Sequence, residues 1–599
     1  MKYYCNPINI SYRYQFNADP RKGGVLQICR EAADPSMICF QGRYYIFASM
    51  NLGVWVSDDL VNWEYHRLPD ALPLYDYAPD VRVLGEWVYF CASSREVNCD
   101  RWRTKDILNG PYEKIEGSFP FWDPNLFADD DGRVYFYWGC SNITPIWGVE
   151  LDPETMQPIG EKRELILGDP FSIGYERIGE DNSTLPASEE EVEARFQAFL
   201  KMRGVPEESL PADVKPLIRG MLTDRPYIEG AWMDKHCGRY YLQYAAPGTQ
   251  YNTYSDGVYV SESPLGPFRL AENNPYSYKP GGFLPGAGHG STMQDRQGNW
   301  WHTSTMRISV NHDFERRLGL WPAGFDADGE LFCNQRYGDW PMTLSGLRQD
   351  AWRDPAWMLL SVHKAAAASS FVPGHEPEKA TDENVQTWWR AGSNSRDEWL
   401  QIDLGKVFDI HAIQVNFADD RIDIPCPGEI RPGSQARYIE EEDHVTQWKL
   451  EGSADGESWF VIEDKSGAGT DLCHDLIVRE EGFAARYLRL GDMAVPYGQN
   501  PCVSGLRVFG LGDGEKPRAA HFHAERTGDL DMVTDIAGQE DALGWNILFG
   551  SSPEKLYHSY MVFEPGPQRI GALISGRDCC VRVDTFNENG ITEGDCVRL

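Results

Sequence analysis

One segment pattern recurs in five copies within the first part of the chain, and this repetition limits the folds that the chain can adopt. Each copy has a polar head residue, a short apolar run, a glycine turn and a run of aromatic residues. Repeats of about 40 to 50 residues with several short strands per unit are typical of a β-propeller. The sequence therefore predicts an all-β fold that begins with a five-bladed propeller over residues 1–350, its inner strands starting at a shared funnel. The heads are Asp34, Asp80, Asp123, Glu229 and His289, at spacings of 46, 43, 106 and 60 residues.

The long third spacing predicts an insertion between the third and fourth blades. Residues 188–222 carry apolar side chains at helical spacing, and Ser188 with Glu191 three residues later has the pattern of a capping box. We expect a helical insertion over about residues 175–222 at the rim of the funnel. The sequence leaves two roles open: the insertion can wall one side of the pocket, or it can be a decoration without function.

Three of the five heads are carboxylic acids, namely Asp34, Asp123 and Glu229. Acids at equivalent places in a radially repeated fold converge on one central point. Cleavage of a glycosidic bond needs two opposed carboxyl groups, and a third acid can tune one of them. The competing interpretation is that each acid is a turn or cap residue, and we adopt that one for residues 129–131.

Composition and charge narrow the range of partners. A chain of 599 residues is too long for one core and predicts several domains. The formal net charge of −35 disfavours nucleic acid and anionic membrane as partners. The 20 Trp and 29 Tyr residues suit stacking on sugar rings, although we expect most of them in the core. The sequence leaves the oligomeric state unknown.

The N-terminal segment and the cysteines indicate a cellular compartment. MKYYCNPINISYRYQFNADP lacks the apolar stretch of a secretory signal, and the chain has no apolar run long enough to span a membrane. The 14 cysteines lack zinc-site spacing and are scattered, apart from Cys579 and Cys580. Scattered cysteines favour reduced thiols. We therefore expect a cytoplasmic protein that does not span a membrane.

The segments around the acids occur in a specific order. They are ADPS with GRYYIFAS, APDV, DPNLFADDDGRVYFYWG, IEG with GRYYLQY, SPLGPF, and GHGS with GNWWHTS. In this order, residues 25–345 resemble the glycoside hydrolases of family 43, five-bladed β-propellers that act mainly on arabinose- and xylose-containing glycans. The resemblance implies that Asp34 is the general base and Glu229 the general acid. It implies that Asp123 is the modulator that keeps Glu229 protonated and orients it.

The resulting expectation is an exo-acting, inverting glycoside hydrolase that releases terminal arabinofuranose or xylose from oligosaccharides. Inversion requires a water molecule between the base and the anomeric carbon, so the acid and the base stand roughly 6.5–9.5 Å apart. Three alternatives remain: an exo-glycosidase acting on galactose- or galactofuranose-containing glycans, a non-catalytic glycan-binding propeller, and a propeller scaffold for protein partners. The retaining fructan hydrolases are disfavoured, because they rely on NDPNG and RDP motifs. This chain has ADPS, and its RDP at residues 353–355 lies beyond the last blade.

Five further side chains are candidates for binding the substrate. Arg316 is the alternative to the candidate Arg317, and Asp80 can also hold the second blade in place. Trp138 is a further stacking candidate that lies in the middle of a strand and suits the core better. The candidates are Trp55, Tyr77, Asp80, Trp122 and Arg317.

His289 heads the fifth unit without a carboxylate. In the family that this segment resembles, a His at this place points into the central channel, often near a calcium ion or a water cluster. A buried His satisfied by hydrogen bonds is the competing interpretation. The chemistry itself requires no cofactor, and His289 is our candidate for a metal site.

The chain changes character after the propeller. Residues 360–512, with WLQIDLG as their most recognisable piece, resemble discoidin-like domains of the coagulation-factor 5/8 type C class. The resemblance implies a jelly-roll β-sandwich that often binds carbohydrate and often holds a structural Ca²⁺ near a turn such as ATDENVQTWW. A packing domain without a ligand is the alternative. Residues 515–599 resemble a small fibronectin type III-like β-sandwich, a spacer or docking module.

Overall fold

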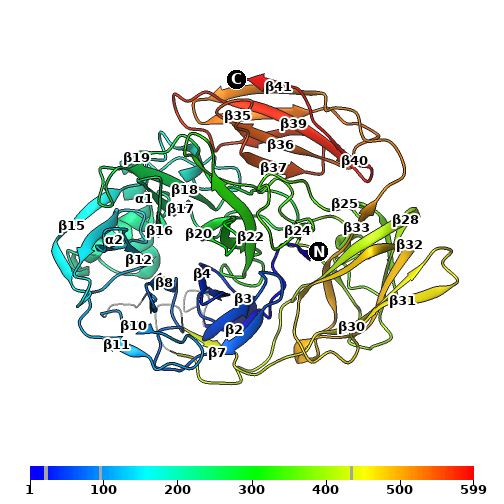
Figure 1. The fold of residues 1–599 in the computed structure, drawn as a ribbon, viewed down its shortest axis with the longest axis horizontal. Coiled ribbons are helices and arrows are strands. Elements are labelled where there is room, and N and C mark those ends of the chain that lie inside the picture. The colour runs from blue at the N-terminus through cyan, green and yellow to red at the C-terminus, as the bar shows by residue number, and fades with distance from the viewer. Residues whose placement is uncertain (19–24, 94–97, 432–435) are drawn as a thin grey trace.

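The computed structural model describes residues 1–18, 25–93, 98–431 and 436–599, and the all-β fold is confirmed (Figure 1). Five four-stranded antiparallel sheets follow one another along residues 36–333, each with its strands in chain order. The inner strands β4, β8, β12, β16 and β20 each contact the next, and β20 contacts β4, so the ring is closed. The five sheets are therefore the blades of a propeller.

The blades have the following strands. The first blade consists of β4 (Ser36–Phe40), β5 (Arg43–Phe47), β6 (Gly53–Ser57) and β7 (Glu64–Arg67). The second blade consists of β8 (Asp80–Leu84), β9 (Trp87–Cys91), β10 (Arg101–Thr104) and β11 (Glu113–Ile115). The third is β12 (Asn125–Ala128), β13 (Val134–Trp138), β14 (Ile146–Leu151) and β15 (Pro158–Ile166). The fourth blade consists of β16 (Glu229–His236), β17 (Arg239–Ala246), β18 (Ser255–Ser261) and β19 (Arg269–Leu270). The fifth blade consists of β20 (Gly288–Gln294), β21 (Trp300–Arg307), β22 (Arg316–Phe325) and β23 (Leu331–Cys333).

A ring of hydrogen bonds joins neighbouring blades at the starts of the inner strands. In four blades a polar side chain accepts a bond from a backbone N–H of an adjacent inner strand. The bonds are Val81 N to Ser36 Oγ at 3.0 Å, Leu126 N to Asp80 Oδ2 at 2.7 Å, Met233 N to Asn125 Oδ1 at 2.8 Å, and Met37 N to Ser291 Oγ at 2.9 Å. In the fourth blade regular pairing resumes at Trp232, which cannot accept such a bond.

The backbone is left-handed, with φ between 48° and 62°, two residues before the equivalent position of every blade. These equivalent positions are Ser36, Asp80, Asn125, Trp232 and Ser291. The five left-handed residues are Asp34, Ala78, Asp123, Gly230 and His289. The predicted heads are therefore only partly equivalent. Asp80 stands two residues further along its strand than Asp34 does, and Glu229 stands one residue before the glycine that takes this place in its blade.

The insertion between β15 and β16 contains two α-helices, α1 (Glu189–Arg203) and α2 (Val214–Met221), and two short 3₁₀ turns (174–176 and 207–209). Ser188 caps α1, and Glu191 completes the capping box. Phe196 and Leu200 are the buried residues of α1, and the Arg219 guanidinium lies 3.8 Å from the Phe196 ring. The helices therefore pack mainly on each other and on the loops around them.

A second domain follows the propeller, and its strands form one hydrogen-bonded sheet of eight strands. Its strands are β25 (Met358–Leu359), β26 (Ala365–Ala368), β27 (Trp389–Arg390), β28 (Leu400–Phe417), β30 (Gln447–Ser453), β31 (Trp459–Asp464), β32 (His474–Ala494) and β33 (Cys502–Leu511). Its apolar core is continuous with that of the propeller, because Trp55 and Trp301 belong to the same buried cluster as Trp389 and Trp448. This continuity ties the second domain to the first and fifth blades.

The C-terminal segment forms two antiparallel sheets, drawn in orange to red in Figure 1. One sheet has β34 (Phe522–Gly528), β35 (Asp531–Ile536) and β38 (Gly566–Ile570); the other has β36 (Gly544–Gly550), β37 (His558–Val562), β39 (Cys580–Asn587), β40 (Gly590–Thr592) and β41 (Cys596–Arg598). Residues of this domain share a buried cluster with the fourth blade, for example Ile574 with Tyr244, and Ile574 also forms a β-bridge with Ile173 in the segment between β15 and β16.

The N-terminus links the domains. β1 (Lys2–Tyr4) pairs with β24 (Met342–Leu344), and β2 (Arg13–Ala18) lies between β3 (Leu26–Glu31) and β29 (Arg437–Ile439). Because β29 belongs to the second domain, this small sheet joins that domain to the strand that leads into the first blade. Within the parts of the chain that the structure describes, no helix has the length and apolar character needed to cross a membrane.

Candidate active site

A pocket with an empty volume of about 510 Å³ lies where the inner strands begin. Side chains from separate blades converge there: Asp34 from the first, Asp123 from the third, Glu229 from the fourth and His289 from the fifth. The sequence-based candidates thus meet at one point, as the repeat predicted. The complete lining is Asp34, Tyr77, Trp122, Asp123, Cys140, Glu229, Thr249, His289, Phe314 and Arg316.

Asp34 is held by groups that favour its ionised form. Its carboxylate accepts hydrogen bonds from Ser49 Oγ at 2.6 Å and from Arg316 Nη1 at 3.2 Å, and Thr305 Oγ1 lies 3.4 Å away. Burial alone would raise the pKa of Asp34, but Arg316, His289 and these hydroxyl groups outweigh it, and the pKa lies below its usual range. Asp34 is therefore ionised at neutral pH.

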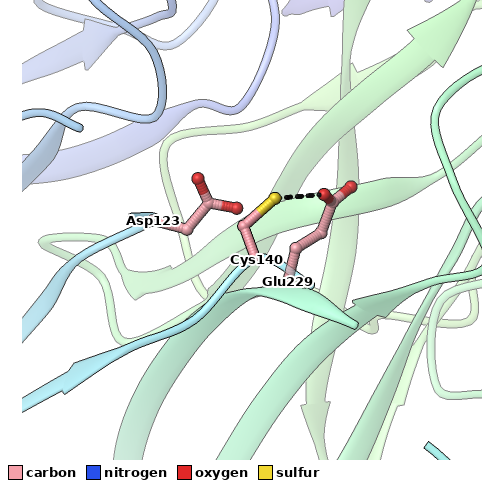
Figure 2. Close-up of side chains that lie close together, drawn as sticks. All are labelled: Asp123, Cys140 and Glu229. Atoms are coloured by element: carbon pink, nitrogen blue, oxygen red, sulfur yellow. Dashed lines mark hydrogen bonds between the residues drawn. The ribbon is translucent and has the colours of Figure 1, made fainter. Parts of the chain in front are cut away.

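Asp123 and Glu229 form a pair of carboxyl groups with Cys140 beside them (Figure 2). One oxygen of each carboxyl group and the Cys140 sulfur all lie within 4.8 Å of one another. Burial raises the pKa of Asp123 and the charges of Glu229 and Asp34 add to this, although His289 opposes it. Two negative charges so close together are unfavourable, so the pair retains a proton above the usual range of a carboxyl group.

The Glu229 carboxyl group is fixed by two donors. Tyr254 donates its hydroxyl proton to Oε1 at 2.5 Å, and the Cys140 thiol donates to Oε2 at 3.1 Å. Burial and the neighbouring carboxylates raise the pKa of Cys140 and of Tyr254, so both remain protonated donors. Glu229 is therefore held in one orientation toward the pocket.

His289 lies between the carboxyl groups. Its Nδ1 atom is 3.4 Å from Asp34 Oδ1 and 3.7 Å from Asp123 Oδ2. Burial disfavours the charged imidazole, but Asp34, Asp123 and Glu229 outweigh it and raise the pKa of His289. The imidazole therefore places a positive charge between carboxylates, and the metal role of His289 stays a prediction.

Aromatic side chains form the walls of the pocket. Trp122 is 39 % exposed and Tyr77 is nearly buried, as expected for two of the predicted substrate contacts. Phe314 adds a third wall, with its ring 5.9 Å from that of Tyr77 and the Arg316 guanidinium 4.7 Å from its centre. These flat faces can stack on the C–H face of a sugar ring.

Three predicted substrate contacts lie outside the pocket, and their assignment is corrected. Trp55 is fully buried, because β6 is the third strand of its blade and packs its side chain in the core. Asp80 is part of the hydrogen-bond ring between blades. Arg317 is buried against the second domain, with Nε 2.9 Å from His474 Nε2. Arg316, the alternative named from the sequence, is the arginine that lines the pocket.

None of the described residues that line the pocket belongs to the helical insertion. The insertion instead contacts the segment just after Cys140. Asn142 Nδ2 donates to Gly220 O at 2.7 Å, and the Ile143 side chain packs close to the Gly220 Cα, where a Cβ atom would clash. The insertion therefore supports one wall from behind instead of forming it.

Four residues of the site escaped the sequence analysis: Cys140, Thr249, Tyr254 and Phe314. Thr249 and Phe314 lie in loops after the second strand of the fourth and fifth blades, where no repeat pattern marks them. Cys140 follows the end of β13, and its position directly after the aromatic run of that repeat is the one sequence signal that points to it as a site residue.

Comparison with known proteins identifies the propeller. Residues 28–176 and 201–331 match Glycosyl hydrolases family 43, and residues 379–490 match the NedA-like, galactose-binding domain. Xylosidase/arabinosidase 43A of Humicola insolens is 27% identical over 341 residues, which cover 50% of this chain and 95% of that protein. A xylosidase/arabinosidase of Bacteroides ovatus is 26% identical over 276 residues, 39% of this chain and 75% of that protein.

A solved structure titled Bacteroides ovatus Xyloglucan PUL GH43B covers 100% of this chain and 98% of that chain, with 15% identity and a TM-score of 0.40. The family match covers the strands that carry all three candidate acids. The propeller is a glycosyl hydrolase family 43 domain followed by a discoidin-like domain, and the chain is a glycoside hydrolase.

Proposed function

We propose that the chain is an exo-acting, inverting glycoside hydrolase that releases terminal arabinofuranose or xylose from oligosaccharides. Asp34 is the general base, Glu229 the general acid, and Asp123 the modulator that keeps a proton in the acid pair. The observation that carries the proposal is the opposite electrostatics of two carboxyl environments in one pocket. Cations and hydroxyl groups surround Asp34, whereas the Asp123–Glu229 pair is buried and crowded by negative charge.

The proposed reaction follows from this difference. Asp34, ionised and accepting bonds from Ser49 and Arg316, removes a proton from a water molecule that attacks the anomeric carbon. Glu229, oriented by Tyr254 and Cys140, passes a proton to the oxygen of the leaving group. His289 balances the charge between the two sides.

The sugar class is supported by the relatives, which are named as xylosidases and arabinosidases. A pocket lined by Tyr77, Trp122 and Phe314 suits the end of a chain better than its middle. We therefore expect monosaccharide products, and polymeric xylan or arabinan as poor substrates beside short oligosaccharides. A cytoplasmic location, in which short imported oligosaccharides are the substrates, fits this expectation.

We also propose that the C-terminal domain is fibronectin type III-like. Its sheets group strands β34, β35 and β38 against β36, β37 and β39 to β41, an arrangement of two packed antiparallel sheets. The discoidin-like domain supplies packing for the propeller, and its capacity to bind glycan or Ca²⁺ is a separate proposal. In its predicted calcium turn, Glu383 is already paired with Arg507 at 2.9 Å.

Hydrolysis of a panel of nitrophenyl glycosides tests the function. The panel contains the α-L-arabinofuranoside, the β-xyloside and the galactofuranoside. We expect release of nitrophenol from the α-L-arabinofuranoside or the β-xyloside. Asp34→Asn and Glu229→Gln should each lower turnover by at least about a thousandfold while the thermal melt stays unchanged. Asp130→Asn is the control, since Asp130 is exposed in the same blade as Asp123. Wild-type activity in either site variant would refute the assignment.

A further inference from the structure

The discoidin-like domain reaches the segment that carries the candidate base. β29 pairs with β2, with Arg437 opposite Asn17, and β2 pairs with β3, which ends at Glu31. Two further backbone bonds extend the contact, from Ala18 N to Ala436 O and from Glu440 N to Tyr14 O, each at 2.9 Å. Asp34 follows Glu31 by three residues, so the base lies at the end of a sheet whose outer strand belongs to another domain.

Four buried charges of alternating sign run from that outer strand to the base. They are Arg437, Glu31, Arg316 and Asp34. Arg437 Nη1 lies 2.9 Å from Glu31 Oε2, Arg316 Nε lies 3.1 Å from Glu31 Oε1, and Arg316 Nη1 lies 3.2 Å from Asp34 Oδ1. Glu31 is 0 % exposed, and both arginines are buried. Charges removed from water need partners, so the position of each group depends on the next.

Arg437 also contacts a wall of the pocket. Its Nη2 atom is hydrogen-bonded to the Tyr77 hydroxyl group, and its Cζ atom lies 5.0 Å from the centre of the Tyr77 ring. Nη1 contacts Gln15 Oε1 as well as Glu31. A planar guanidinium can serve several acceptors at once in a fixed geometry, which an ammonium group cannot do.

We propose that Arg437 is a positioning residue of the active site, through which the discoidin-like domain fixes both the base Asp34 and the pocket wall Tyr77. The proposal rests on the proposed function for its catalytic readout. Arg437 touches no reacting atom. It acts on Asp34 through Glu31 and Arg316, and on the sugar through Tyr77.

The charge balance gives the direction of the effect. Without Arg437, Arg316 is the remaining close cation at Glu31 among the residues that the structure describes, so its guanidinium is drawn toward Glu31 and holds Asp34 less well. Protonation of Asp34 then becomes easier, and the acid limb of the pH–rate profile moves to higher pH. The other ionisable groups facing Asp34 are Asp123, Cys140, Glu229, Tyr254 and His289.

The test compares Arg437→Met with Arg507→Met. Arg507 is a buried arginine of the same domain that contacts the propeller through Asp339 O at 2.6 Å and pairs with Glu383, but it lies outside the pocket. Both variants are measured for kcat and KM against pH, and for hydrogen–deuterium exchange of the amides in residues 31–37. Arg437→Lys is the conservative variant, because it keeps the charge but not the fork.

We expect Arg437→Met to lower kcat/KM about tenfold, to move the acid limb to higher pH, and to speed exchange in residues 31–37. Arg437→Lys restores the acid limb because the charge returns, but it raises KM because the bond between the guanidinium and the Tyr77 hydroxyl group is lost. Arg507→Met changes the melting temperature without moving the limb. If Arg437→Met does not fold, the KM and the exchange of Arg437→Lys decide.

An unchanged limb, KM and exchange rate in the Arg437 variants would overturn the proposal, as would an equal shift in Arg507→Met. A wild-type protein without turnover on any glycoside would refute the proposed function alone. The exchange comparison would then still decide whether Arg437 positions the segment of Asp34.

Discussion

Tyr254 donates its hydroxyl proton to Oε1 of Glu229 over 2.5 Å, and this bond holds the carboxyl oxygen of the candidate acid that Cys140 does not bind. Tyr254 is buried on the loop before β18, so the bond couples the acid to the fold of its own blade. Leaving a buried acceptor without its donor costs about 1–3 kcal/mol. The orientation of Glu229 therefore depends measurably on one hydroxyl group.

Tyr254→Phe is expected to lower kcat/KM by roughly ten- to a hundredfold, because the variant loses that bond while the ring still fills its space. Steady-state kinetics on the best nitrophenyl glycoside measures the effect. Tyr241→Phe is the matched control, since its hydroxyl donates to Gly329 O at 2.6 Å outside the pocket. Equal losses in the two variants would mean that Tyr254 has only a structural role.

The pH dependence follows from the directions of the pKa shifts. Turnover needs Asp34 ionised, and because its pKa is lowered, activity should persist below the usual aspartate range of about 4. Turnover also needs a proton in the Asp123–Glu229 pair. Because the pKa of Asp123 is raised, the alkaline limb should lie above the usual carboxyl range.

His289→Gln tests the sign of these shifts. The protonated imidazole favours the ionised forms of both Asp34 and Asp123, so its removal raises both pKa values. Both limbs of the kcat/KM profile should then move to higher pH. A shift of either limb to lower pH would contradict the charge assigned to His289.

Trp122→Ala should raise KM several-fold with a smaller effect on kcat, because a stacking face is lost that serves ground and transition states alike. The loss corresponds to about 1 kcal/mol. Trp55→Phe is the control, since Trp55 is buried in the core and its change should lower the melting temperature without altering KM. A normal KM in Trp122→Ala would remove Trp122 from the sugar site.

Asp80→Ala should lower the free energy of unfolding by about 1–3 kcal/mol, since the Leu126 N–H and the Asn125 amide lose a buried acceptor. Denaturant unfolding measures this loss. The KM of the folded variant should stay at the wild-type value, because Asp80 lies outside the pocket. A raised KM with unchanged stability would return Asp80 to the substrate site.

The propeller and its three acids could be predicted from the sequence because their signals are local. Strand, turn and head residues recur with a fixed period, and Asp34 and Asp123 occupy the same left-handed position in their blades. The misplacement of Asp80 has a simple cause: in APDV the acid stands two residues later than in ADPS, and so falls on the first paired position of its strand.

Other features of the site depend on the tertiary structure. Arg316 and Arg317 are neighbours in β22, and successive side chains of a strand point to opposite faces. Which one faces the pocket therefore depends on the register of the whole blade. Arg437 is separated from Tyr77 by 360 residues, and no local pattern predicts that the two meet.

The anomeric configuration of the first-formed sugar tests the central claim most directly. Proton NMR of the reaction with the best substrate, recorded before mutarotation, distinguishes the two outcomes. If Asp34 activates water while Glu229 protonates the leaving group, the product has the inverted configuration. A product with the retained configuration would contradict the account, because Asp34 would then attack the sugar as a nucleophile.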